Sequence, residues 1–255
     1  MEKKIGIIGS GNVAAVLGRK FKAAGHTILQ VISRNAKAAS ELAYEWDTES
    51  SNYKSTINRL ADVYIVAVSD SAIAEMVDDL RLPGKVVAHT AASVPKEVLQ
   101  NVTEHFGVFY PLQSLRTEMP GLPDIPIFVD GSDELTRTRL KALAQSISPE
   151  KVAEADTESR TKLHVAAVLV SNFTNHLYKL ASDYCRKEGL DFKQLQPLIE
   201  ETALRLRSMS PGEAQTGPAI RQDEETIQKH LDLLKNESGL KEIYEQMTRS
   251  IRGTN

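Results

Sequence analysis

Residues 5–14 read Ile-Gly-Ile-Ile-Gly-Ser-Gly-Asn-Val-Ala, and this stretch decides the fold of the first half of the chain. A short apolar strand passes through two glycines into a segment whose apolar residues have helical spacing. Strand, G-x-G-x-x-G/A and helix together are the fingerprint of a dinucleotide-binding unit, in which phosphates meet free N–H groups of the helix. The alternative is a glycine-rich turn that binds nothing. We expect a cofactor cradle from these residues: Gly9, Ser10, Gly11, Asn12 and Val13.

The next apolar strand, residues 27–32, indicates which dinucleotide is bound, because it ends at Ser33 and Arg34. NAD-binding proteins place Asp or Glu there, about 20 residues after the glycines, to accept a hydrogen bond from the ribose 2′-OH. A carboxylate would repel a 2′-phosphate, whereas a hydroxyl and a guanidinium bind it. We therefore expect NADP as cofactor. The alternative is that Arg34 is an ordinary surface residue of a turn.

Length and composition describe an ordinary globular protein. The chain has 255 residues, of which 41% are hydrophobic and 25% charged, and its net charge is −3. This charge predicts no nucleic-acid partner, and no apolar run is long enough to predict a membrane span or a signal peptide. The single cysteine, Cys185, excludes a disulfide framework and a clustered zinc motif and is interpreted as a packing residue. We expect a cytoplasmic protein without a metal.

The order of predicted elements divides the chain into two parts. Up to residue 156 strands alternate with helices, which predicts an α/β domain with a doubly wound, mostly parallel sheet. After it only helices are expected, so residues 157–255 are interpreted as a helical domain for substrate binding and dimerisation. The predicted strands are residues 5–8, 27–32, 62–68, 85–89, 107–110, 125–129 and 152–153. The predicted helices are one after Gly11 and residues 37–44, 72–80, 134–146, 157–187, 192–209, 240–251 and one that begins near Ala219.

Ligands of open α/β sheets bind outside the carboxyl ends of the strands, so the residues at those ends are candidates. Val68 and Ser69 follow one predicted strand and are assigned to the cofactor site. His89 ends the next strand and is a candidate proton donor, because imidazole titrates near neutrality. The alternative for His89 is a structural histidine bonded to backbone. A third strand end carries Tyr110-Pro111-Leu112-Gln113-Ser114.

The long predicted helix contains no charged residue between Leu163 and Tyr178, which indicates that more than one of its faces is covered. His164 and Asn172 belong to a polar stripe on this helix and are candidate catalytic residues. A polar stripe on a covered helix must be hydrogen-bonded. Neighbouring helices, a dimer partner or a substrate between the two domains are the possible partners.

The segment Gly217-Pro218-Ala219-Ile220-Arg221-Gln222-Asp223 is the last candidate. It is a predicted loop that enters a helix, where free N–H groups and Arg221 together would hold an anion. Asp223 complements the helix dipole and is alternatively a capping residue.

Several of these motifs together resemble NADP-dependent oxidoreductases that join a Rossmann domain to an uncharacterised helical domain. The resemblance covers essentially the whole chain and rests on five segments: Gly9 to Ala14, His89 to Ser93, Tyr110 to Gln113, Ser171-Asn172 and Thr216 to Asp223. That family usually has Gly between the Arg and the Asp of the last motif, where this chain has Gln222. The N-terminal half is also similar to pyrroline-5-carboxylate reductase, ketopantoate reductase, the β-hydroxyacid dehydrogenases and the deazaflavin-dependent NADP reductases.

Two motifs of those enzymes are missing from this chain, so the resemblance does not assign it the activity of either. The Ser-Gly-Ser-Gly-Pro-Ala helix start of pyrroline-5-carboxylate reductase is absent. The Lys and Asn that β-hydroxyacid dehydrogenases carry one helical turn apart are not matched, because Lys162 is followed by Ala166.

The sequence thus predicts a homodimeric NADP(H)-dependent oxidoreductase. A hydride would pass between nicotinamide and a small carbonyl or imine held between the two domains, with His89, His164, Asn172 and Arg221 around it. The alternative is a non-catalytic NADP(H)-binding regulator whose helical domain is a partner surface.

Overall fold

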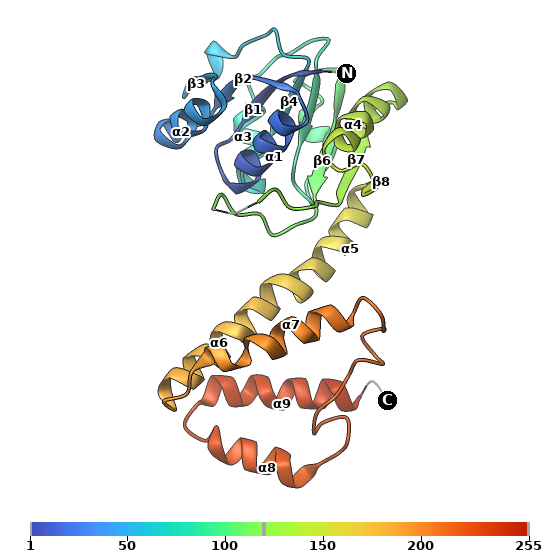
Figure 1. Ribbon diagram of the computed structural model, residues 1–255. Helices are drawn as coiled ribbons and strands as arrows, with labels where there is room; N and C mark the ends of the chain where they lie inside the picture. The colour runs from blue at the N-terminus through green and yellow to red at the C-terminus, as the bar shows by residue number, and fades with distance from the viewer. Residues whose placement is uncertain (1, 119–120, 254–255) are drawn as a thin grey trace. The chain divides into compact units, whose positions relative to one another are not determined.

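A computed structural model describes residues 2–118 and 121–253 of the chain (Figure 1). The chain divides into two compact units, residues 1–172 and 173–255. The change from mixed to all-helical structure occurs earlier, at Thr157, so the division at residue 172 falls inside a continuous helical segment. The domain boundary near residue 156 stays a prediction.

The first unit contains an eight-stranded sheet whose strands lie in the order β3-β2-β1-β4-β5-β6-β7-β8. Every neighbouring pair is parallel except β6 and β7. The order reverses between β1 and β4, and open sheets of this kind bind ligands at such a point, outside the carboxyl ends of the strands. The predicted doubly wound α/β class is therefore confirmed. The strands are β1 (Lys4–Ile8), β2 (Thr27–Ile32), β3 (Glu49–Ser51), β4 (Val63–Val66), β5 (Val86–His89), β6 (His105–Pro111), β7 (Ile127–Gly131) and β8 (Val152–Glu154).

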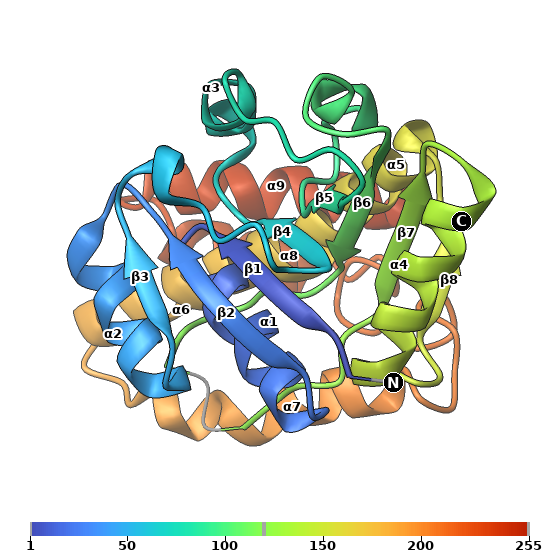
Figure 2. The same cartoon turned by 90° about the horizontal axis from the view of Figure 1, so that it is seen from above.

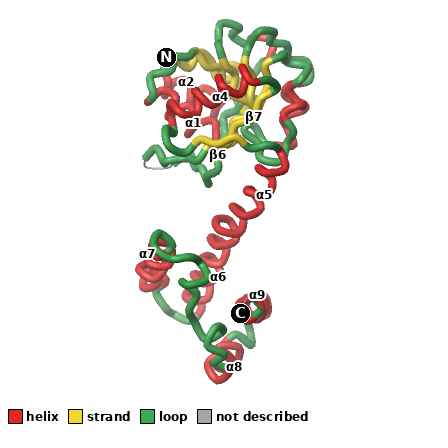
Figure 3. Tube along the Cα trace, turned by 90° about the vertical axis from the view of Figure 1, so that its right-hand side faces the viewer, coloured by secondary structure: helices red, strands yellow, loops and turns green. Residues whose placement is uncertain are grey.

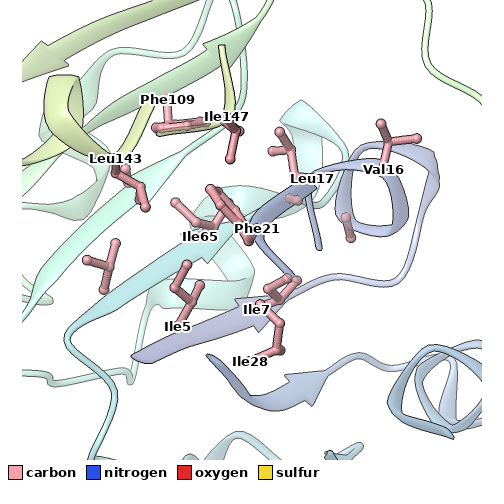
Figure 4. Close-up of a cluster of buried hydrophobic side chains, with 14 of the residues drawn as sticks. Ile5, Ile7, Val16, Leu17, Phe21, Ile28, Ile65, Phe109, Leu143 and Ile147 are labelled. Carbon is pink, nitrogen blue, oxygen red and sulfur yellow. The ribbon is translucent and has the colours of Figure 1, made fainter. Parts of the chain in front are cut away.

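Helices cover both faces of this sheet (Figure 2). Helices α1 (Asn12–Ala23), α2 (Ala36–Trp46) and α4 (Glu134–Ile147) contribute to one hydrophobic cluster, and α3 (Ile73–Val77) contributes to the other. Alternate residues of each central strand face opposite clusters, as Ile65 and Val66 of β4 do. In the first cluster Phe21 packs beside Phe109, with ring centroids 5.8 Å apart (Figure 4). The continuous apolar strands of the sequence are thus explained by burial on both faces.

Two details of this unit differ from the sequence prediction. Strand β3 was not predicted, because its residues Glu-Ser-Ser are polar and, among the described strands, it pairs with β2 alone at the edge of the sheet. The helix predicted for residues 72–80 is shorter. A 3-10 turn, Asp70–Ala72, precedes α3, which ends at Val77.

A single helical segment follows the sheet, and its middle is wound as a π-helix. Helix α5 (Thr157–Ala167) leads into π-helical residues Val168–Phe173 and then into α6 (Thr174–Lys187). The exposed apolar residues along it include Val165, Val170 and Phe173, and Val170 is 75% exposed. Within the first unit, the described residues therefore do not supply the covering that the uncharged sequence predicts for Val165 and Val170.

The described residues of the second unit form helices joined by turns and loops, without a strand (Figure 3). After α6 it contains a 3-10 turn, Phe192–Leu195, and helices α7 (Gln196–Arg205), α8 (Glu224–Leu233) and α9 (Ser238–Arg252). Cys185 is a buried free thiol, as a packing role predicts. Among the described residues, no helix combines the length and apolar character needed to cross a membrane.

Candidate cofactor site and adjoining cavity

The turn between β1 and α1 has the shape that a pyrophosphate needs. Gly9 has φ +126°, and a Cβ there would lie 2.1 Å from the carbonyl oxygen of Ala67, so no other residue fits. A Cβ on Gly11 would meet no atom of the described residues within 4 Å, which leaves open space in front of the helix start. Gly11 caps α1 without a side-chain hydrogen bond, and the described first turn holds no acidic residue. The N–H groups at this positive helix end are therefore available to an anion.

The other predicted cradle residues fix this turn in place. The hydroxyl of Ser10 donates to Ser33 Oγ at 2.8 Å, which joins the ends of β1 and β2. Asn12 Oδ1 accepts hydrogen bonds from the backbone and the hydroxyl of Thr117, so its side chain holds a loop. Val13 is half-buried against the first hydrophobic cluster.

Arg34 follows β2 and belongs to the part of the cofactor site that is predicted to bind the 2′-phosphate. Its guanidinium is 66% exposed and pairs with Glu75 at 3.2 Å, a contact that solvent weakens. Arg34 also lines a cavity of about 320 Å³ together with Tyr53 and Lys54. Lys54 was missed because a lone lysine after an unpredicted edge strand carries no sequence signal. The open cradle and the two cations, Arg34 after β2 and Lys54 after β3, fit a dinucleotide that carries a 2′-phosphate.

The ends of β4 and β5 continue the same edge of the sheet. Val68 is half-buried against the second hydrophobic cluster, and Ser69 is exposed. His89 is fully buried, and its Nδ1 accepts a hydrogen bond from the backbone N–H of Ala91. Its Nε2 finds no hydrogen-bond partner among the described residues. Burial, helped by repulsion from Arg160, lowers the pKa of His89 to about 4, so the ring is neutral near pH 7.

A buried arginine that the sequence analysis overlooked anchors the loop after β5. Arg160 of α5 is 0% exposed, and its guanidinium donates to the carbonyl oxygens of Ala92 and Val94. It also lies 3.5 Å from the carboxylate of Asp130, which Lys96 contacts at 3.0 Å through both oxygens. These contacts join α5, the loop after β5 and strand β7. Its position in a charged stretch, Glu-Ser-Arg-Thr-Lys, made Arg160 look like a surface residue.

A cavity of about 520 Å³ opens where β6 ends beside α5. Within it Tyr110 is 7% exposed, and its hydroxyl oxygen lies 3.0 Å from His164 Nδ1. Ser171 and Asn172, from the π-helical turn, also line this cavity. Such turns displace side chains from regular helical positions and are frequent at functional sites. The structure thus brings together His164 and Asn172, two of the four candidate catalytic residues.

The remaining candidate, Arg221, belongs to the second unit and is exposed. The helix expected to begin near Ala219 begins at Glu224, because Gln222 has φ +54° and ends the preceding turn. Asp223 is the N-cap and accepts from the backbone N–H of Thr226, which is the capping alternative. Three successive carboxylates at this helix start disfavour an anion there. That Arg221 joins His89, His164 and Asn172 in one site stays a prediction.

Comparisons with known proteins agree with this geometry. Residues 4–93 match the family "NADP oxidoreductase coenzyme F420-dependent", and residues 125–251 match "Domain of unknown function (DUF2520)". The chain is 38% identical to the "putative NADP oxidoreductase" of Bacteroides fragilis over 99% of its own length and 98% of that chain, with a TM-score of 0.90. A search of curated proteins finds no match.

More distant solved structures share the fold. An imine reductase from Myxococcus stipitatus in complex with NADP+ is 15% identical over 98% of this chain and 93% of that one, with a TM-score of 0.65. A reductive aminase from Aspergillus terreus in complex with NADPH and ethyl levulinate is 18% identical over 99% and 96%, with a TM-score of 0.67. Cradle, family matches and the full-length relative converge: the chain belongs to the NADP-dependent oxidoreductases that join a Rossmann domain to a DUF2520 domain.

Proposed function

We propose that the chain transfers a hydride between NADP(H) and a small carbonyl or imine compound held in the cavity beside Tyr110 and His164. One observation carries this proposal. The cavity begins at the carboxyl end of β6, and the cofactor cradle lies at the carboxyl end of β1. Because β1, β4, β5 and β6 are parallel, the two lie along the same edge of the sheet.

The size and lining of the cavity support a small organic substrate. Its volume falls within the range of ordinary ligand sites. Apolar side chains such as Leu112, Leu163 and Val170 alternate around it with a few polar ones. Imine reductase and reductive aminase, two proteins with this fold, are named for reactions at carbon–nitrogen double bonds.

The proposal assigns roles to most of the predicted site residues. The backbone at Gly9 and Gly11 holds the pyrophosphate, and Ser33 and Arg34 hold the 2′-phosphate. NADPH supplies the hydride when it is bound. Val68 and Ser69 border the cofactor. Neutral His89 holds the loop after β5 through the hydrogen bond that its Nδ1 accepts from the backbone N–H of Ala91. The residues proposed to contact the substrate in the cavity are Tyr110, His164 and Asn172.

A cavity-filling substitution tests the location. Wild type is offered a panel of ketones, aldehydes and cyclic imines while NADPH absorbance is followed. Ala167→Trp places a large ring into the cavity, and we expect loss of turnover with unchanged NADPH binding by fluorescence. Lys162→Trp, on an exposed position of the same helix, is the matched control. Full turnover in Ala167→Trp would refute the location.

The exposed apolar residues of α5 and the π-helical turn support a homodimer, in which a second copy covers them. Light scattering at micromolar concentration should give twice the mass of one chain, and a monomer would contradict this. The same surface also suits a different protein, as a non-catalytic NADP(H)-binding regulator requires. NADPH binding without turnover of any panel compound would favour that alternative.

A further inference from the structure

We infer that the hydroxyl of Tyr110 gives the proton to the substrate oxygen and that His164 replaces this proton from water. This inference rests on the proposed function of the cavity. It assigns the general acid, a role for which the sequence offered His89.

The lining of the cavity leaves few choices for an acid. Among the described residues around it, Tyr110 and His164 are the ones whose side chains carry an ionisable proton. The other polar lining residues are neutral amides and hydroxyls: Gln113, Ser114, Ser171 and Asn172. His89 does not line the cavity, and its burial keeps it neutral.

The geometry of the pair suits a relay. Tyr110 is held at the end of β6, and His164 approaches from α5 with its ring edge-on to the tyrosine, at a centroid distance of 6.3 Å and an angle of 73°. The distance of 3.0 Å between Nδ1 and the hydroxyl oxygen is a hydrogen bond. With the ring proton on Nδ1, His164 donates to this oxygen, and the O–H of Tyr110 is left to point toward a substrate.

The surroundings keep the tyrosine protonated. Burial raises the pKa of Tyr110, the carboxylate of Asp70 raises it further, and the guanidinium of Arg160 opposes them. A phenol that holds its proton at neutral pH is a donor rather than a base. His164 is exposed to solvent, which gives the relay an outlet to water.

The steps balance for a carbonyl substrate. The hydride forms the new C–H bond, and the electron pair of the C=O π bond takes the proton of Tyr110. The Nδ1 proton of His164 moves to the phenolate oxygen, and Nε2 takes one proton from water. One hydride and one proton are thus consumed, and both side chains end neutral. An N-alkylated iminium ion needs the hydride alone, because its nitrogen already lacks a lone pair.

This difference between substrates gives the test. Cyclopentanone and N-methyl-1-pyrrolinium are compared as five-membered ring substrates in wild type, Tyr110→Phe and His164→Asn. We expect Tyr110→Phe to reduce kcat for the ketone by about 10²–10⁴-fold, the usual contribution of a general acid, and to preserve reduction of the iminium ion. A purely structural loss would slow both substrates equally. His176→Asn, an exposed histidine of α6, is the matched control for His164→Asn.

A second measurement does not depend on turnover. The ¹⁵N NMR signals of the His164 ring, identified by their absence in His164→Asn, should show the proton on Nδ1 in wild type and a changed tautomer balance in Tyr110→Phe. Equal ketone reduction by wild type and Tyr110→Phe would overturn the relay and leave the proposed function intact. Failure of wild type with both compounds would overturn both.

Discussion

The two units of the chain bury their apolar residues to very different degrees. The sheet unit has two large hydrophobic clusters, in which strands and helices supply fully buried side chains on both faces of the sheet. In the helical unit the described buried residues are few: Cys185, Ala219, Ile227 and Leu234. Large apolar residues such as Leu198 and Leu233 are exposed there, and α9 has no buried residue.

This contrast indicates that the sheet unit is stabilised by its own core, whereas the helical unit depends more on contacts with a partner. The sheet unit removes its apolar surface from water within one chain, which is the main favourable term in folding. The helical unit has amphipathic helices whose apolar faces are left exposed within that unit, and such faces mark interaction surfaces. We therefore expect substitutions in the sheet unit to act through its own core. Substitutions in the helical unit should show their effect through the proposed dimer as well.

The largest effect should come from the buried arginine of the sheet unit. Arg160→Met removes the donor to three backbone carbonyls and one partner of Asp130. Breaking a buried ion pair on one side costs about 3–5 kcal/mol, so urea unfolding should show a loss of this order in the sheet unit. Arg59→Met, on an exposed arginine, is the control. A loss below about 1 kcal/mol would mean that the anchor is dispensable.

The second effect depends on pH. The pKa of His89 lies at about 4 in the folded protein and near 6.5 in the unfolded chain. The unfolded state therefore binds more protons between these values, so stability is full above pH 6.5 and falls as pH drops toward 4. The total is roughly 3 kcal/mol. We expect His89→Gln to flatten the dependence of the unfolding free energy on pH, with His176→Gln, at an exposed histidine, as the control.

A smaller effect should appear in cofactor choice. Arg34→Ala removes a charge-assisted contact with the 2′-phosphate, and NADPH binding should weaken by about 1.5–3 kcal/mol. NADH lacks this phosphate, so its affinity should change little. Calorimetric titration with both cofactors measures the difference, with Lys37→Ala on the neighbouring exposed face as control. Equal weakening of the two cofactors would reject the assignment of Arg34.

The smallest effect tests the helical unit. Gln222 has φ +54°, a left-handed conformation that is costly for a residue with a Cβ. Gln222→Gly removes the cost of the left-handed conformation and should stabilise the helical unit by up to roughly 1 kcal/mol. The greater conformational entropy of glycine in the unfolded chain offsets part of this gain. Gln215→Gly, at an exposed position without a positive φ, should destabilise it slightly. Thermal unfolding of both variants decides this, and a lower midpoint for Gln222→Gly would contradict the prediction.

Local signals in the sequence were sufficient for most of the fold. The apolar runs in the strands and the glycines at positions 9 and 11 are patterns of consecutive residues, and they correctly predicted the sheet class and the cofactor. Strand β3 was missed because its three polar residues pair only at an edge. The start of α8 was misplaced because a left-handed Gln222 has no sequence signature.

The sequence by itself thus determined the dinucleotide unit, since its chemistry resides in consecutive residues whose backbone makes the site. Only the tertiary structure decided the cavity beside it. Tyr110 and His164 are 54 positions apart in the sequence. Their hydrogen bond forms because the end of β6 and helix α5 lie next to each other in the folded chain. The role of Arg160 is decided in the same way, since burial converts an arginine that looks solvated in sequence into the anchor of a loop. Contacts between distant segments depend on how the chain packs, and no local pattern of residues records them.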